Sequence, residues 1–287
     1  MTQVMRESSR DEESRGAQNE ISRGKRFAFG KNWTRFLSVL NETRIQAAED
    51  SLRAKLEVDH LRGKSFLDIG SGSGLFSLAA RRLGAVVTSF DYDRQSVGCT
   101  QELRRRFFPG DSGWRVEQGS VLDEAFVRGK GQFDVVYSWG VLHHTGSMWQ
   151  ALSNAAMPVS NGGQLFIAIY NDQGMLSSYW RKVKELYCSG PLGRLLVCSG
   201  FIPFFVARGA IGDLLLRRRN PIRRYLNVTY RGMSPLHDWL DWLGGLPFEV
   251  AKPEAIVRFY RDRGFTLRNL TTVGGALGNN EFVFVKD

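Results

Sequence analysis

The sequence has few of the residues from which proteins build disulfides and zinc sites. Among its 287 residues are three cysteines and four histidines. The cysteines, Cys99, Cys188 and Cys198, include no C-x-x-C pair, and the histidines include no H-x-x-x-H pair. We therefore expect neither a disulfide framework nor a metal site, and a reducing compartment such as the cytoplasm.

Patterns typical of a targeting segment or a membrane span are missing as well. Residues 1–26 mix charges of both signs with Ser, Gln and Gly, without the apolar core of a secretory signal. So few bulky apolar side chains cannot offset the entropy lost on ordering, which predicts a disordered tail over residues 1–26. The uncharged core of the most apolar stretch, Leu195–Ala207, has 13 residues and is too short to cross a bilayer.

Residues 27–287 have the composition of a globular domain. The whole chain is 43% hydrophobic and 24% charged, which is enough apolar material for a full core. Its formal net charge of +10 fits nucleic acid, an anionic membrane surface or an anionic substrate as partner.

The stretch Ser65–Gly74 reads S-F-L-D-I-G-S-G-S-G, the pattern of a strand, a tight turn and a helix start. Glycines at such a turn let a ligand approach the backbone closely. The dinucleotide fingerprint G-x-G-x-x-G would place its third glycine at position 75, where this chain has Leu75. With Asp68 ahead of the glycines, the pattern is D-x-G-x-G-x-G instead. It resembles motif I of the class I S-adenosylmethionine-dependent methyltransferases.

This resemblance implies S-adenosylmethionine as cofactor. The loop residues expected to contact it are Asp68, Gly70, Ser71, Gly72 and Gly74. Asp91 ends the next strand, where a carboxylate is placed to accept hydrogen bonds from both ribose hydroxyls. Tyr92 follows it and is expected against the adenine. Further contacts are expected from Ser120 and Val121 after the third strand and from Ser138 at the end of the fourth.

The order of the predicted elements agrees with the same family. After five strands and an insert, a helix over residues 253–263 precedes two closing strands. We predict an α/β fold, a Rossmann-like seven-stranded methyltransferase sheet with an antiparallel last strand and a helical insert after strand five. The methyltransferase domain would occupy residues 27–287, with the helical cap at about residues 175–250.

Candidate acceptor-site residues follow the fourth and fifth strands. Methyltransferases of adenine, cytosine or glutamine nitrogens typically carry N/D-P-P-Y/F after strand four, where this chain has S-W-G-V, so that class is disfavoured. The run G-V-L-H-H is similar to small-molecule methyltransferases, and His144 is a candidate for taking a proton from the acceptor. Tyr170 and Asp172 are candidates for orienting the substrate. The alternatives are helix capping or packing for His144 and an Asx turn for Asp172.

The insert joins an apolar stretch to a cluster of arginines. Residues 192–224 begin with L-G-R-L-L-V and end with five arginines between Arg217 and Arg224. Two interpretations stay open: a lid over a hydrophobic substrate, and a surface element in the interface of an anionic membrane. Nucleic acid is disfavoured as a partner because the adjoining run is apolar.

Within the family, the sequence looks most similar to the small-molecule O-methyltransferases of ubiquinone biosynthesis. The resemblance implies S-adenosylmethionine-dependent methyl transfer to an oxygen or nitrogen of a small, hydrophobic or aromatic molecule. The enzyme would be cytoplasmic, and on the membrane interpretation it would be peripheral to the inner face of the membrane. Two alternatives are an RNA or protein methyltransferase that binds through the basic insert, and a non-catalytic cofactor-binding module of the same fold.

Overall fold

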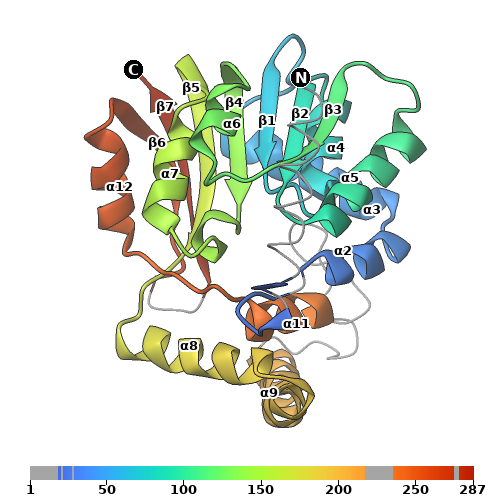
Figure 1. Cartoon of the computed structure of the whole chain (residues 1–287), viewed down its shortest axis with the longest axis vertical. Helices are drawn as coiled ribbons and strands as arrows, with labels where there is room; N and C mark the ends of the chain where they lie inside the picture. Colours follow the sequence, from blue (N-terminus) through green and yellow to red (C-terminus); the bar gives the residue numbers. More distant parts are fainter. Residues whose placement is uncertain (1–18, 21, 28, 217–234, 275–277) are drawn as a thin grey trace.

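The computed structural model describes residues 19–20, 22–27, 29–216, 235–274 and 278–287. Its centre is a seven-stranded sheet in the order β3-β2-β1-β4-β5-β7-β6 (Figure 1). The strands are β1 (Ser65–Ile69), β2 (Val86–Asp91), β3 (Trp114–Gln118), β4 (Phe133–Trp139), β5 (Val159–Tyr170), β6 (Phe265–Thr271) and β7 (Asn279–Lys286). Strands β1 to β5 pair in parallel, and β7 runs antiparallel to both β5 and β6. The predicted sheet with an antiparallel last strand is confirmed.

Helices cover both faces of this sheet. One face carries α3 (Glu42–Leu56), α4 (Leu75–Arg82) and α5 (Arg94–Phe107), and the other carries α6 (Glu124–Arg128), α7 (Met148–Ala156) and α12 (Pro253–Arg261) (Figure 1). β1 shows the reason, because Phe66 packs into one buried core and its neighbour Leu67 into the other. Successive residues of a strand point to opposite faces, so a strand with apolar residues at both needs cover on both sides.

The antiparallel direction of β7 brings its first residues to the edge at which the parallel strands end. One row of the sheet aligns Trp139 of β4, Ala168 of β5, Glu281 of β7 and Thr271 of β6. Residues in register face the same side of a sheet. Side chains from distant parts of the chain therefore meet at this edge.

The predicted helical insert after strand five is confirmed, and it lies beyond the carboxyl edge of the sheet (Figure 1). It contains α8 (Met175–Cys188), α9 (Pro191–Ile211), the π-helical turn η2 (Gly212–Leu216) and α11 (Pro235–Gly244). Its helices and the segment after α11 share a small core, made of Trp180, Val183, Tyr187, Val197, Leu243, Leu246 and Phe248. The arginine cluster Arg217–Arg224 lies outside the described residues.

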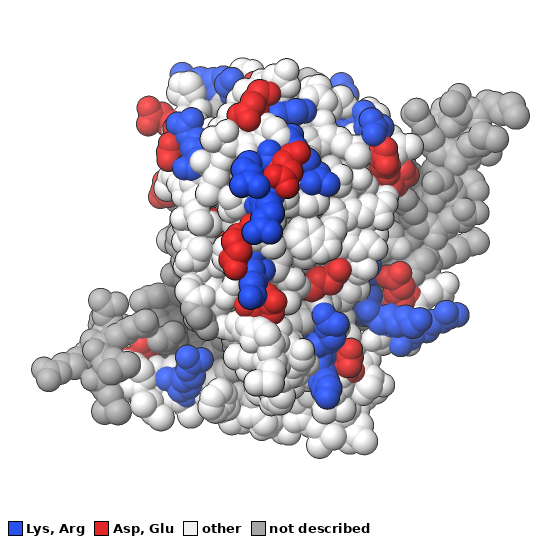
Figure 2. Space-filling model, turned by 90° about the vertical axis from the view of Figure 1, so that its left-hand side faces the viewer, with Lys and Arg blue, Asp and Glu red and all other residues white. Residues whose placement is uncertain are grey.

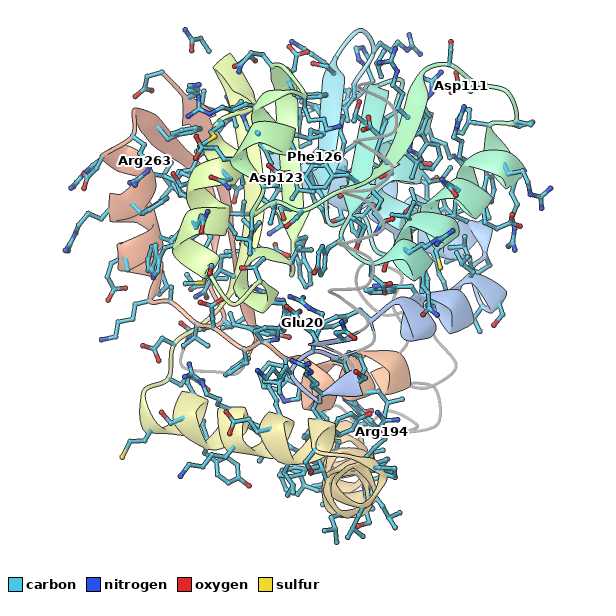
Figure 3. The ribbon with its side chains drawn as sticks, in the orientation of Figure 1. Glu20, Asp111, Asp123, Phe126, Arg194 and Arg263 are labelled. Atoms are coloured by element: carbon cyan, nitrogen blue, oxygen red, sulfur yellow. The ribbon has the colours of Figure 1, made fainter. Side chains whose placement is uncertain are left out.

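The segment before α2 (Phe29–Ser38) lies against the domain. The N–H of Phe27 donates to the carbonyl of Leu246 at 3.1 Å, and the Arg26 guanidinium donates to Glu20 and to the carbonyl of His144. Glu20 accordingly sits between the sheet and the insert (Figure 3). Glu20 and Arg26 belong to the stretch that was predicted as a disordered tail because it has few apolar residues, and polar contacts hold them in place. Residues 1–18 of that predicted tail lie outside the described part of the chain.

Candidate active site

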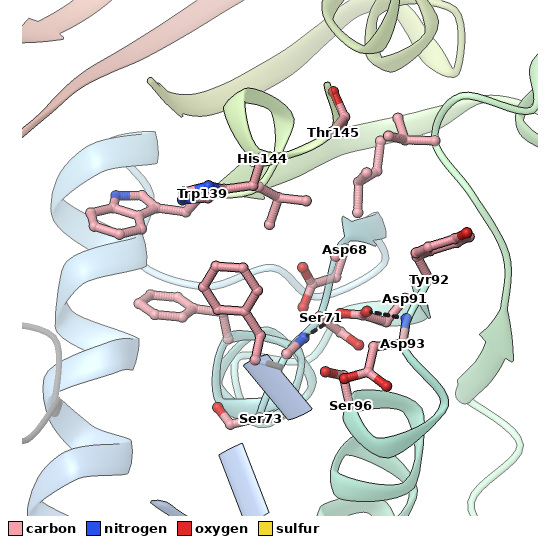
Figure 4. A pocket seen from close by; sticks show the side chains of 18 of the residues that line it. Asp68, Ser71, Ser73, Asp91, Tyr92, Asp93, Ser96, Trp139, His144 and Thr145 are labelled. Carbon is pink, nitrogen blue, oxygen red and sulfur yellow. Dashed lines mark hydrogen bonds between the residues drawn. The ribbon is translucent and has the colours of Figure 1, made fainter. Parts of the chain in front are cut away.

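A cavity of about 810 Å³ is bounded by the carboxyl edge of the sheet, α2 and the insert. Residues predicted as cofactor contacts form one part of its wall: Asp68, Gly70, Ser71, Gly72, Asp91, Tyr92, Ser120 and Val121. His144 and Tyr170, which were predicted for the acceptor side, line it as well. In Figure 4, Asp68 and Asp91 gather beside the glycine loop, and Trp139 and His144 reach the same space from β4 and the turn that follows.

The glycine loop is shaped by its own backbone and by packing on both sides. Gly72 has φ +55°, and a Cβ there would lie 3.0 Å from the indole of Trp33 on α2. Gly74 has φ +81°, and a Cβ there would lie 2.8 Å from the backbone of Thr100 on α5. Both conformations are left-handed, which favours glycine. Gly72 therefore lets Trp33 of α2 pack closely over the loop, whereas Gly74 lets the loop pack against α5.

Asp91 is fixed by two backbone donors. Its Oδ2 accepts the N–H of Gly72 and its Oδ1 accepts the N–H of Asp93, both at 2.9 Å (Figure 4). Burial raises the pKa of Asp91 to about 6, against the lowering effect of these two hydrogen bonds. The carboxylate is thus ionised at neutral pH and held in one orientation, with further lone pairs available to a diol.

Asp68 begins a buried chain of hydroxyl groups. Its Oδ2 accepts a hydrogen bond from Ser77 at 2.5 Å, Ser77 lies 2.7 Å from Ser89, and the indole of Trp114 donates to Ser89 at 2.9 Å. Because Ser77 gives its one hydroxyl hydrogen to Asp68, Ser89 donates to Ser77, and the hydrogens of the chain run from Trp114 toward Asp68. Burial raises the pKa of Asp68 to about 7, with the nearby Asp91 charge also raising it. Asp68 therefore carries a carboxyl group that titrates near neutral pH at the cavity wall.

The wall beyond β3 combines polar and apolar groups. The Ser120 Oγ accepts the N–H of Leu122 at 3.1 Å, which turns the chain back toward the cavity. The Val121 carbonyl accepts the side-chain amide of Asn154 at 2.8 Å, so this carbonyl is already engaged. The guanidinium of Arg26 lies 5.1 Å from the centre of the Tyr92 ring and covers it from the N-terminal segment. Ser120, Val121 and Tyr92 all line the same cavity.

Three predicted site residues do not reach the cavity. The Ser138 side chain is fully buried and donates to the carbonyl of Ile69 at 3.0 Å, which ties β4 to β1. Since side chains alternate along a strand, its neighbour Trp139 faces the cavity instead. Asp172 accepts the N–H of Gly174 at 2.8 Å, which is the Asx-turn alternative. Gly74 also stands outside the cavity wall, for the packing reason given above.

His144 reaches the cavity as a neutral imidazole. Its Nδ1 lies 2.6 Å from the carbonyl of Pro247, and because a carbonyl only accepts, Nδ1 carries the hydrogen. Burial lowers the pKa of His144 to about 3, with the charges of Lys184 and Arg26 lowering it further. Nε2 is then an unprotonated hydrogen-bond acceptor but a weak base. The geometry favours orientation of an acceptor over proton removal by this ring.

Several cavity residues were missed from the sequence. Besides the predicted Tyr170, the wall is rich in aromatic rings: Phe27, Phe29, Trp33, Phe76, Tyr137, Trp139, Trp239 and Trp242. Trp239 and Trp242 come from α11 of the insert. An ion pair of Lys55 and Glu281 belongs to the same wall, with Nζ and Oε2 2.5 Å apart. A glutamate within the apolar strand N-E-F-V-F was the available signal.

Known proteins agree with this fold. A sequence model described as methyltransferase domain matches residues 40–209, more than half of the chain. The ubiquinone biosynthesis O-methyltransferase of Sinorhizobium medicae is 32% identical over 111 residues, which is 39% of this chain and 43% of that protein. The one of Burkholderia vietnamiensis is 33% identical over 113 residues, 39% of this chain and 47% of that protein. The alignments span less than half of the length of these two relatives.

A solved structure supports the same fold. It is the magnesium protoporphyrin IX methyltransferase of Synechocystis PCC 6803 with bound S-adenosylhomocysteine, at a TM-score of 0.51 and 17% identity. The match covers 90% of this chain and 94% of that one. From the family match and the sheet topology, the chain belongs to the methyltransferase domain family and has the class I fold, for which S-adenosylmethionine is the methyl donor.

Proposed function

We propose that this protein transfers a methyl group from S-adenosylmethionine to an oxygen or nitrogen of a small, hydrophobic or aromatic molecule. The observation that carries the proposal is that one cavity of about 810 Å³ joins the glycine loop and Asp91 to an aromatic-rich wall. Pockets of several hundred cubic ångströms accommodate small molecules. The names of the curated relatives, both O-methyltransferases, favour oxygen as the accepting atom.

The cofactor fits the polar part of this cavity. Asp91 would receive the ribose hydroxyls, Tyr92 and the Ser120–Leu122 turn would enclose the adenine, and the loop around Gly72 would hold the methionine part. When bound, the cofactor supplies an activated methyl group on a sulfonium. The protein must then align the acceptor with that methyl group and exclude water, which contributes several kcal/mol in well-oriented reactions.

The position of α2 favours a small acceptor over a macromolecule. Trp33 packs over Gly72, and the N–H of Gly30 donates to Asp93 at 2.9 Å, so α2 is fastened across the cofactor part of the cavity. Arg26 adds a second fastening through the carbonyl of His144. A polymer would need this cover to move aside, whereas a small molecule needs only a transient opening.

Calorimetry and methyl transfer test the proposal together. We expect S-adenosylmethionine and S-adenosylhomocysteine to bind the full chain, and tritium from the labelled methyl group to pass to members of a panel of phenols and aromatic amines. Binding without transfer to any panel member would favour the non-catalytic module. Transfer to total RNA or protein but not to the panel would favour the macromolecular alternative, and absence of binding would refute the cofactor assignment.

The insert supports contact with an anionic membrane as a second proposed property. Within the described part of the chain, one helix, Pro191–Leu214, is long and apolar enough to cross a membrane by length and composition, and almost none of it is buried. It extends past the 13-residue uncharged core by including Arg194 and Arg208. The lowest part of the molecule in Figure 2, where α8 and α9 lie, is largely white, whereas both signs of charge cover the upper body.

Both chemistries needed for an interfacial helix are present on this surface. Exposed apolar side chains of α8, α9 and η2 include Met175, Leu176, Tyr179, Leu186, Leu192, Leu195, Leu196, Phe204, Ile211 and Leu214. Exposed basic side chains are Arg181, Lys182, Arg194 and Arg208, and Arg194 projects from the α9 end of the insert in Figure 3. Apolar area and basic charge together favour binding in the plane of an anionic interface.

Vesicle flotation tests this second property. The chain should float with vesicles of phosphatidylcholine and phosphatidylglycerol and much less with phosphatidylcholine alone. The double variant Leu195→Ser/Phe204→Ser should lose flotation, whereas Leu270→Ser, which removes an exposed apolar side chain of β6, should keep it. Equal flotation of the two variants would refute membrane contact through α9.

A further inference from the structure

The row of residues Trp139, Ala168, Glu281 and Thr271 across the sheet edge places the carboxylate of Glu281 in the aromatic-rich wall of the cavity. Ala168 separates Trp139 from Glu281 in this row, and its small side chain lets the indole reach across. The Trp139 Nε1–H donates to Glu281 Oε1 at 2.8 Å. Lys55 enters from α3, where its Nζ pairs with Glu281 and donates to Thr271 at 2.7 Å. Four elements thus hold one carboxylate in a fixed position.

This carboxylate is buried yet keeps acceptor capacity. The Glu281 side chain is 9% exposed; its Oε1 accepts the Trp139 Nε1–H, and its Oε2 lies 2.5 Å from the Lys55 ammonium, so that each oxygen has one donor and a second lone pair available. The Oδ1 of Asn279, two positions earlier on the same face of β7, is also buried and receives no hydrogen bond from the described part of the chain. Both residues line the cavity.

The Asn279 Oδ1 and the second lone pairs of Glu281 indicate the chemistry of a partner. A buried acceptor without a donor, such as the Asn279 Oδ1, costs about 1–3 kcal/mol, and most such atoms in proteins are satisfied. Since Lys55 already balances the charge of Glu281, a neutral donor suits the pair better than a cation or an anion. The surrounding wall, with Trp139, Tyr137 and Phe76, supplies flat apolar surface around it.

We propose that Glu281, positioned by Trp139 and Lys55, is the subsite that binds the methyl acceptor. The molecule it takes is aromatic and bears a neutral hydrogen-bond donor, a hydroxyl or an amino group. Glu281 accepts the hydrogen bond of that donor and fixes the orientation of the ring in the cavity. His144, with its unprotonated Nε2, contributes a second acceptor on the cavity wall. This inference rests on the proposed methyl transfer and deepens it by naming the recognised group.

Equilibrium dialysis with 2-naphthol and naphthalene tests the subsite. The two probes share the ring system and differ in the donor. They are measured with and without saturating S-adenosylhomocysteine, so that no methyl group is transferred. Because a hydrogen bond to a charged group is worth about 1.5–3 kcal/mol, the wild-type chain should bind 2-naphthol at least about tenfold more tightly.

Two variants and a matched control locate the effect. In Glu281→Leu, 2-naphthol and naphthalene should bind about equally tightly. Glu281→Gln keeps one acceptor oxygen and preserves the shape, and it should reduce the ratio of the two affinities at least about threefold. The control is Glu117→Leu, because Glu117 pairs with Lys130 at the same 2.5 Å separation but outside the cavity wall. Its preference should equal that of the wild type.

The outcomes separate this inference from the proposed function. A preference that survives in both Glu281 variants, or wild-type binding of neither probe, overturns the subsite. If Glu281→Leu does not fold, the Glu281→Gln result decides alone. Absence of S-adenosylhomocysteine binding, measured by calorimetry on the same wild-type sample, overturns the proposed function instead.

Discussion

Replacing Asp68 with asparagine should stabilise the ligand-free protein at high pH while weakening its hold on the cofactor. Asp68 is 2% exposed and accepts a hydrogen bond from the Ser77 hydroxyl, which an asparagine oxygen can also accept. Its burial raises the pKa to about 7, which means that folding must keep an unfavourable charge buried at alkaline pH. The substitution removes that charge with little change of shape.

The size and pH range of the effect follow from the two pKa values. In the unfolded chain the carboxyl group titrates near 3.8, and in the folded protein near 7. Because the folded state holds the proton more tightly, the favourable contribution of Asp68 is complete below pH 3.8 and is lost as pH rises through 7. Between pH 5 and pH 8 the wild type should lose about 2–3 kcal/mol through this residue, at about 1.4 kcal/mol for each unit from 5 to 7.

Urea unfolding of the wild type and Asp68→Asn at pH 5 and pH 8, without cofactor, measures this loss. The free energy of unfolding of the variant, relative to the wild type, should be about 2–3 kcal/mol higher at pH 8 than at pH 5. Asp91 titrates in both proteins, so its contribution largely cancels in the comparison. Calorimetry at pH 8 should show weaker S-adenosylmethionine binding to the variant. A stability difference that is the same at both pH values would refute the buried-charge explanation.

Three further predictions concern the same cavity. Asp91→Asn should weaken S-adenosylmethionine binding at least about tenfold in calorimetry, since hydrogen bonds to a charged group are worth about 1.5–3 kcal/mol. Wild-type affinity should fall below pH 6, because this carboxylate is then protonated. Unchanged affinity in the variant would contradict the role of Asp91. Gly72→Ala should lower the free energy of unfolding by about 1–3 kcal/mol and also weaken cofactor binding, because its Cβ meets Trp33. The control is Gly63→Ala, whose backbone is also left-handed but whose Cβ has open space, so it should lower the free energy of unfolding and leave cofactor binding unchanged. The kcat of methyl transfer should show no inflection from His144 between pH 5 and pH 8, because its pKa is about 3; an inflection near 6.5 that vanishes in His144→Gln would disprove this.

Local patterns in the sequence were enough to predict the fold and the part of the cavity wall around the glycine loop. A glycine loop between a strand and a helix depends on neighbours in the chain, as does a carboxylate at the end of the next strand. Gly72 and Asp91 were therefore predicted from a few adjacent residues, and one hydrogen bond joins them. The closing strands β6 and β7 were predicted in the same way, because their alternating and apolar runs are local signals.

Local patterns could not predict which residues face the rest of the cavity. Whether Ser138 or Trp139 faces the cavity is set by the pleat of β4, which one residue of register reverses. The pKa of His144 depends on burial beneath elements distant in sequence, which turns a predicted base into a neutral acceptor.

By itself, then, the sequence determined that this chain folds as a class I methyltransferase with a glycine loop, an acidic residue at the end of the second strand and a helical insert, because those features are encoded by adjacent residues. Only the tertiary structure decided that Lys55 of α3 and Glu281 of β7 meet beside Trp139. The physical reason is that the antiparallel direction of β7 carries its first residues to the carboxyl edge of the parallel strands, a relation that no stretch of sequence contains.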